Sequence, residues 1–127
     1  MLSLSKHGVP YWRVPFDEPG ADTAAGFLRN SAISAVNVSE VVAKLDDAGV
    51  PEYAVRRAVG GLLMEIVPFD AEQALQAGLL RTATRAEGLS LGDRACLGLA
   101  KCLGLSAVTA DRAWARVQIG VPVTLLR

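Results

Sequence analysis

The stretch SLGDRACLGLAKCLGLSAVTAD, residues 90–111, decides the fold that we predict for this chain. Ser90 suits a helix N-cap, and Asp93 follows three residues later at the spacing of a capping box. Apolar side chains then recur at helical intervals, which predicts an amphipathic helix. The predicted buried stripe consists of Cys96, Leu99, Ala100 and Leu103.

The second half of the same stretch predicts a strand followed by an acid. Gly104 is placed to end the helix, because glycine readily adopts the left-handed conformation of a helix C-cap. Residues 105–109 are typical of a short buried strand, and Asp111 comes next, where another helix can begin at Arg112. A helix, a strand and an acid at a helix start together indicate an α/β unit.

Working outward from this unit, we predict four strands, at residues 32–36, 65–69, 105–109 and 122–126. Helical patterns separate these strands, and that alternation is typical of parallel sheets. The predicted fold class is therefore α/β, with a mostly parallel central sheet and helices on both faces. Ligands of such sheets bind beyond the carboxyl ends of the strands, where we expect the functional residues.

The remaining helices are predicted from their caps and apolar spacing. Asn37 is predicted to open a helix that ends at Gly49, Pro51 to lie in the first turn of the next helix, and Asp70 to cap a helix that runs to Leu80. Residues 81–88 are predicted to form a helix or a polar connector, and residues 112–118 a short helix. The helix that begins at Pro51 is predicted to point these side chains inward: Tyr53, Ala54, Ala58, Leu62 and Leu63.

Length and composition limit the classes to which the chain can belong. Its 127 residues suit one domain, since domains cluster near ~100–150 residues. Apolar residues make up 51% and charged residues 20%, a globular balance, and no apolar run approaches the ~18 residues of a membrane span. Thirteen basic and thirteen acidic residues give a net charge of zero, so any contact with RNA must be local.

The cysteines and the first residues bear on the compartment. Cys96 and Cys102 are six residues apart on one predicted helix, so they point to different sides and cannot easily form a disulfide or a metal site. Residues 1–6 lack the long apolar segment and cleavage site of a secretion signal. We therefore expect reduced thiols and a cytoplasmic location.

Two parts of the sequence resemble PIN-domain ribonucleases, specifically toxins of the VapC type from type II toxin–antitoxin systems. LSLGDRACL at residues 89–97, followed by TADRAW at 109–114, resembles the acidic core of that family. AISAVNVSEV at residues 32–41 resembles its strand and acid-bearing helix. The resemblance covers residues 18–127, which we expect to form a single PIN-like domain, and it leaves residues 1–17 as an atypical N-terminal segment.

The resemblance implies that Glu40, Asp93 and Asp111 are the catalytic residues and the ligands of Mg²⁺ or Mn²⁺, with Thr109 as a polar neighbour. Each acid alone is explained as well by capping or by the helix dipole. Three acids in three matching contexts favour the functional interpretation. Clustered carboxylates repel one another unless a cation binds them, and Mg²⁺ prefers such oxygen ligands. The implied reaction is metal-dependent endoribonuclease hydrolysis of RNA phosphodiester bonds.

The same resemblance implies partners. It predicts a cognate antitoxin protein, an RNA substrate and a homodimer, with no membrane association. The rival interpretation is a catalytically inactive PIN-like domain that still binds an antitoxin or another protein. The two differ in metal-dependent cleavage, which only the first predicts.

One family feature has no match in this chain. PIN domains open with a strand that ends in an Asp, and that Asp should fall near His7, but residues 1–16 contain no carboxylate. Because a lost metal ligand weakens cation binding, we expect weak or absent nuclease activity. Two alternatives are that Asp17 replaces the missing Asp, or that a misplaced coding start makes the first sixteen residues foreign.

Other residues near these motifs have ordinary interpretations beside functional ones. Arg94 and Arg112 each follow an acid and would meet a phosphate or solvate a helix face. Arg81 and Arg85 share a predicted helix face and would contact RNA or solvent. Trp114 is predicted to be a core or interface anchor, because no second aromatic residue accompanies it.

Overall fold

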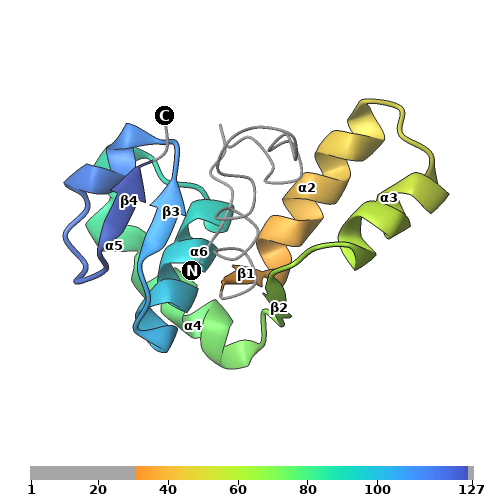
Figure 1. The fold of residues 1–127 in the computed structure, drawn as a ribbon. Coiled ribbons are helices and arrows are strands. Elements are labelled where there is room, and N and C mark those ends of the chain that lie inside the picture. Colours follow the sequence, from red (N-terminus) through yellow and green to blue (C-terminus); the bar gives the residue numbers. More distant parts are fainter. Residues whose placement is uncertain (1–30, 126–127) are drawn as a thin grey trace, which may run out of the picture.

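The computed structural model describes residues 31–125, and Figure 1 shows how their elements are arranged. The elements are, in chain order, β1 (Ala32–Ser34), α2 (Ala35–Asp47), α3 (Glu52–Gly60), β2 (Glu65–Val67), α4 (Ala71–Leu79), α5 (Arg81–Thr84), η2 (Arg85–Glu87), α6 (Leu91–Leu103), β3 (Ala107–Thr109), η3 (Arg112–Arg116) and β4 (Val123–Leu125). The atypical N-terminal segment, residues 1–17, with Asp17 as the possible substitute ligand, lies outside the described residues.

Helix α6 begins and ends where the sequence predicts. The Asp93 backbone N–H donates to Ser90 Oγ at 3.2 Å, and the Ser90 N–H donates to Asp93 Oδ2 at 3.0 Å, which confirms the capping box. Gly104 ends the helix with a φ of 65°. Leu103, however, is 48% exposed, so its place in the buried stripe was wrong. The core cluster packed on α6 ends at Ala100, and the last turn extends past it.

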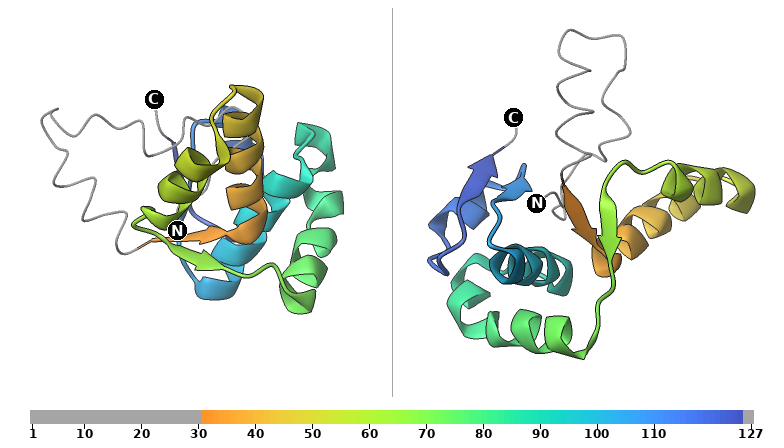
Figure 2. Two further views of the ribbon diagram at one scale, coloured as in Figure 1. Left: turned by 90° about the vertical axis from the view of Figure 1, so that its right-hand side faces the viewer. Right: turned by 60° about the horizontal axis from the view of Figure 1, so that its bottom comes forward.

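The strands pair in parallel, as predicted. Strand β1 pairs with β2, with Ile33 opposite Ile66, and β3 pairs with β4, with Val108 opposite Thr124. Among residues 31–125 the strands form these two pairs rather than one continuous sheet. Helix α6 contacts both β1 and β3, and the two strand pairs lie on either side of it (Figure 2).

Neighbouring strand residues point to opposite faces, and both faces are covered. Ala32 and Ala107 belong to the larger core cluster, with side chains of α6 and with Trp114 of η3. Ile33 and Val108, one residue further along each strand, belong to a second cluster, against which Val38 of α2 packs. This alternation confirms the predicted α/β class with helices on both faces.

Helix α2 starts earlier than predicted. Ser34 is its N-cap, because the Ser34 hydroxyl accepts the backbone N–H of Val36 at 3.2 Å. The strand predicted to reach residue 36 therefore ends at Ser34, and Asn37 is not a cap. Asn37 lies inside the helix instead, with a side chain that is free to bond across to another element.

The inward face predicted for the helix after Pro51, which is α3, was also partly wrong. Tyr53 is 71% exposed and Leu63 38% exposed, whereas Val55 is buried. Helix α3 packs against α2 at the end of the molecule farthest from β3 and β4 (Figure 1), so only a narrow stripe is covered.

The other predicted elements lie in place, mostly with shorter bounds. Asp70 caps α4 as predicted, accepting the Gln73 N–H at 3.0 Å. Residues 81–88 form α5 and η2, and the short helix predicted at 112–118 is the 3₁₀ helix η3. Strands β2, β3 and β4 have three residues each where five were predicted, because the hydrogen-bonded register extends no further.

Neither cysteine forms a disulfide: Cys96 is buried and Cys102 is exposed. Within residues 31–125, no helix has both the length and the apolar character that crossing a bilayer requires.

Candidate functional site

A buried amide joins the two helices that carry the first two predicted acids. Asn37 of α2 is 0% exposed, and its Nδ2 donates to Glu40 Oε1 at 2.9 Å. The same Nδ2 donates to the backbone carbonyl of Gly92 on α6 at 3.0 Å. Both amide hydrogens are therefore used, and α2 is tied to the first turn of α6.

The Glu40 carboxylate lies directly over Gly92. A Cβ built on Gly92 would lie 2.5 Å from Glu40 Cδ and closer still to both carboxylate oxygens. Real Cβ atoms essentially never make contacts under 3.0 Å. Only glycine therefore fits at this position while Glu40 stays where it is.

Asp93 follows Gly92, so the approach of the helices brings two carboxylates together. Asp93 is 1% exposed and is held by its bond from the Ser90 N–H. Burial raises the pKa of Glu40 above its ordinary value, and the negative charge of Asp93 raises it further. The hydrogen bond from Asn37 and the charge of Lys44 lower the pKa of Glu40 and partly oppose these effects.

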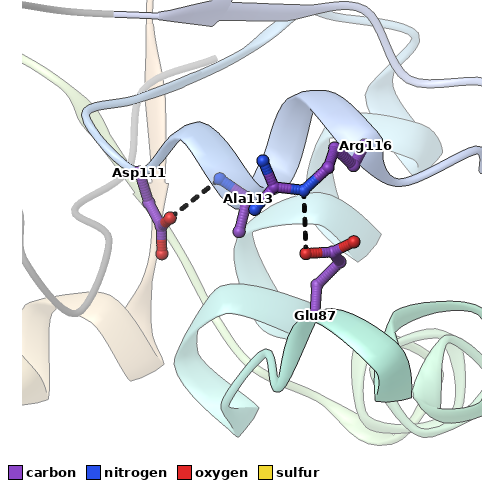
Figure 3. A network of polar contacts seen from close by, with 4 residues as sticks. All are labelled: Glu87, Asp111, Ala113 and Arg116. Atoms are coloured by element: carbon purple, nitrogen blue, oxygen red, sulfur yellow. Dashed lines mark hydrogen bonds and ion pairs between the residues drawn. The ribbon is translucent and has the colours of Figure 1, made fainter.

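Asp111 lies at the carboxyl end of β3, as predicted. It is the N-cap of η3, where its Oδ1 accepts the Ala113 N–H at 2.9 Å (Figure 3), and its own N–H donates to Thr109 Oγ1 at 3.0 Å. Thr109 is 1% exposed. The second oxygen, Oδ2, is buried and has no hydrogen-bond partner among the described residues.

Figure 3 also shows how η3 is fixed. Arg116 Nε donates to Glu87 Oε2 at 3.1 Å and so ties η3 to η2. Trp114 is 0% exposed in the larger cluster, which confirms the predicted core anchor. The segment that carries Asp111 is therefore held from both ends.

The structure brings Glu40 and Asp93 together, but it does not gather all three acids. Across residues 31–125, no set of three or more His, Cys, Asp or Glu side chains is close enough to hold a metal ion. In ligand type the residues fit Mg²⁺ or Mn²⁺, because the carboxyl groups of Glu40 and Asp93 lie near each other and Asp111 Oδ2 is a buried carboxyl oxygen with no hydrogen-bond partner within residues 31–125. In number the described set is incomplete.

The arginines near the motifs differ in their surroundings. Arg94 Nη1 donates to the backbone carbonyl of Ala77 at 3.0 Å, near the end of α4, so Arg94 does not solvate a helix face. Arg81, Arg85 and Arg112 are exposed.

Sequence reasoning missed the bridging position of Asn37. It predicted a cap at that residue because Asn is a good N-cap. The signal that could have corrected it is Ser34, an equally good cap three residues earlier.

Several solved structures share this fold. The crystal structure of DNA-bound VapBC from Salmonella typhimurium matches with a TM-score of 0.75 and 19% identity over 97% of this chain and 96% of that chain. FitAcB from Neisseria gonorrhoeae matches with a TM-score of 0.59 and 18% identity over 97% and 96%. A toxin–antitoxin complex from Klebsiella pneumoniae matches with a TM-score of 0.56 and 24% identity over 73% and 71%.

The sequence itself identifies the family. No curated protein matches it. The PIN domain family, however, matches residues 9–120, which is most of the chain and includes residues 9–17 of the N-terminal segment. This chain belongs to the PIN domain family.

Proposed function

We propose that this protein is a VapC-like toxin, a metal-dependent endoribonuclease that hydrolyses RNA phosphodiester bonds. Membership of the PIN domain family supports the proposal. Further support comes from the fold, which it shares with the VapBC and FitAcB structures. The expected cofactor is Mg²⁺ or Mn²⁺.

The observation that carries the proposal is the contact between α2 and α6. There the half-buried Glu40 carboxylate lies over Gly92 and close to the buried Asp93, and neighbouring carboxylates removed from water repel each other unless a cation binds them. Glu40 and Asp93 would hold the divalent ion, and Asp111 would join them directly or through water. When bound, the ion would supply an activated water and stabilise the leaving oxygen. The chain's own residues orient the carboxylates and keep that edge of the strands polar.

The proposal includes partners and a compartment. The cognate partner would be an antitoxin protein, as in the toxin–antitoxin complex from Klebsiella pneumoniae. We further propose a homodimer, an RNA substrate contacted locally because the net charge is zero, and a cytoplasmic location.

A second candidate function is an inactive PIN domain that retains antitoxin binding. Residues 1–16 contain no carboxylate side chain, and residues 31–125 hold no cluster of three or more His, Cys, Asp or Glu side chains that could bind a metal ion. These two observations favour weak cleavage, because a site that lacks one ligand holds its cation poorly.

The test is an RNA-cleavage assay with Mg²⁺ or Mn²⁺ on the wild type, Asp93→Asn and Asp17→Asn. Asparagine at position 93 can still accept the Ser90 N–H, so this variant removes charge while it keeps the helix cap. Cleavage that is lost in Asp93→Asn supports the nuclease, and further loss in Asp17→Asn identifies Asp17 as the substitute ligand. A wild type that never cleaves but binds its antitoxin would favour the inactive domain.

A further inference from the structure

The orientation of the Asn37 amide follows from its neighbours. Its nitrogen faces two acceptors, Glu40 Oε1 and the Gly92 carbonyl. The reversed amide would place an oxygen against both acceptors, so only one orientation is compatible with them. This orientation leaves Asn37 Oδ1 buried without a hydrogen-bond partner among the described residues. A fully buried amide with one unsatisfied atom is costly, which argues that its two donated bonds matter.

One of those two bonds acts directly on the carboxylate of Glu40, and the other ties Asn37 to the Gly92 carbonyl. Glutamate has a long and mobile side chain, and both desolvation and the neighbouring Asp93 favour its escape toward solvent. The bond from Asn37 opposes that escape. Because the same nitrogen also donates to the Gly92 carbonyl, Asn37 fixes the position of Glu40 relative to the backbone directly before Asp93.

We propose that Asn37 is a positioning residue, which holds the Glu40 carboxylate over Gly92 at a fixed spacing from Asp93. This inference rests on the proposed function, because its purpose is to prepare two carboxylates for one cation. Asn37 acts through Glu40 and does not touch the substrate. Partners that orient metal ligands in this way typically contribute about 10–100-fold to metal affinity or activity.

The variant Asn37→Leu removes both donors and keeps a side chain of similar length. Thr84→Val is the matched control: Thr84 on α5 is also 0% exposed, and its hydroxyl donates to the Leu80 carbonyl at 2.8 Å. Calorimetric titration with Mn²⁺ should give affinities about 10–100-fold weaker in Asn37→Leu and unchanged in Thr84→Val. If Asn37→Leu does not fold, Asn37→Ala carries the same expectation.

A second measurement needs no metal. Urea unfolding in EDTA of the wild type, Asn37→Leu, Glu40→Ala and the double variant forms a double-mutant cycle. The loss of stability caused by Asn37→Leu should shrink once Glu40 is absent. A merely structural Asn37 would cost the same in both backgrounds, and that additivity would overturn the proposal.

The outcomes separate this inference from the proposed function. Folded Asn37→Leu with wild-type Mn²⁺ affinity, or an equal weakening in Thr84→Val, overturns the positioning role. A wild type that binds no Mn²⁺ contradicts the metal-dependent function instead. In that case the cycle in EDTA alone decides whether Asn37 holds Glu40.

Discussion

Alanine at position 92 would place a methyl group where the Glu40 carboxylate lies. The built Cβ is 2.5 Å from Glu40 Cδ, whereas ordinary van der Waals contact starts at 3.4 Å, so the carboxyl group must move by about 0.9 Å. A misplacement of about 1 Å in an active site can cost about 100-fold in rate. We therefore expect Gly92→Ala to lower RNA cleavage about 100-fold and to weaken Mn²⁺ binding.

The control for this substitution is Gly78→Ala on α4, where a built Cβ meets nothing within 4 Å. Alanine favours a helix over glycine by about 1 kcal/mol, so Gly78→Ala should be slightly more stable and fully active. Calorimetric Mn²⁺ titration, an RNA-cleavage assay and urea unfolding measure the three quantities. A folded Gly92→Ala with the Mn²⁺ affinity of Gly78→Ala would refute the reasoning, because Glu40 would then not need the space over Gly92.

Three other predictions follow from single residues. Because folding raises the pKa of Glu40, the free energy of unfolding of the metal-free wild type should fall relative to Glu40→Gln as the pH rises from the ordinary pKa of 4.5 through the pKa in the folded protein. Urea unfolding at several pH values checks this, and a difference between the two proteins that does not change with pH contradicts it. Arg94→Met, which loses the bond to the Ala77 carbonyl, should lower the free energy of unfolding by about 1 kcal/mol without changing RNA cleavage; lost cleavage in a folded variant would indicate a phosphate contact. Trp114→Phe should cost less than the ~3–5 kcal/mol of Trp114→Ala, because a phenyl ring still fills part of the buried site and the lost indole N–H has no partner in the described residues; equal losses in urea unfolding would contradict this.

The elements that the sequence predicted well are those with short-range signals. Ser90 and Asp93 bond to each other across one turn, Asp70 bonds to Gln73, and Gly104 takes a positive φ at a helix end. Each of these interactions involves residues within a few positions of one another. Helices α4 and α6 were therefore predictable without knowledge of the tertiary fold.

The errors arose where local signals compete or where packing decides. Ser34 and Asn37 are both good N-caps, and the pattern alone does not say which one the chain uses. Leu103 and Tyr53 fit helical stripes, but a stripe does not show where the neighbouring element ends. Tertiary contacts decided all of these positions.

The candidate site was reached through family resemblance rather than through local patterns. Asn37 bonds to Gly92 across 55 positions of sequence, and no helical periodicity predicts such a contact. The acids Glu40, Asp93 and Asp111 looked locally like caps and dipole partners, and Asp93 and Asp111 do serve as such.

Asp93 is both a proposed metal ligand and part of the capping box of α6, which affects how its mutants should be interpreted. Asp93→Ala would remove a charge and also leave the Ser90 N–H without its acceptor, at the start of the most buried helix. Loss of a helix cap costs about 1 kcal/mol, and changes of that size can alter protein abundance several-fold in cells. If Asp93→Ala abolished the effect of the protein in cells, the cause could be a lower amount of folded protein or a lost catalytic carboxylate. Asp93→Asn, checked by immunoblot for equal expression, separates the two.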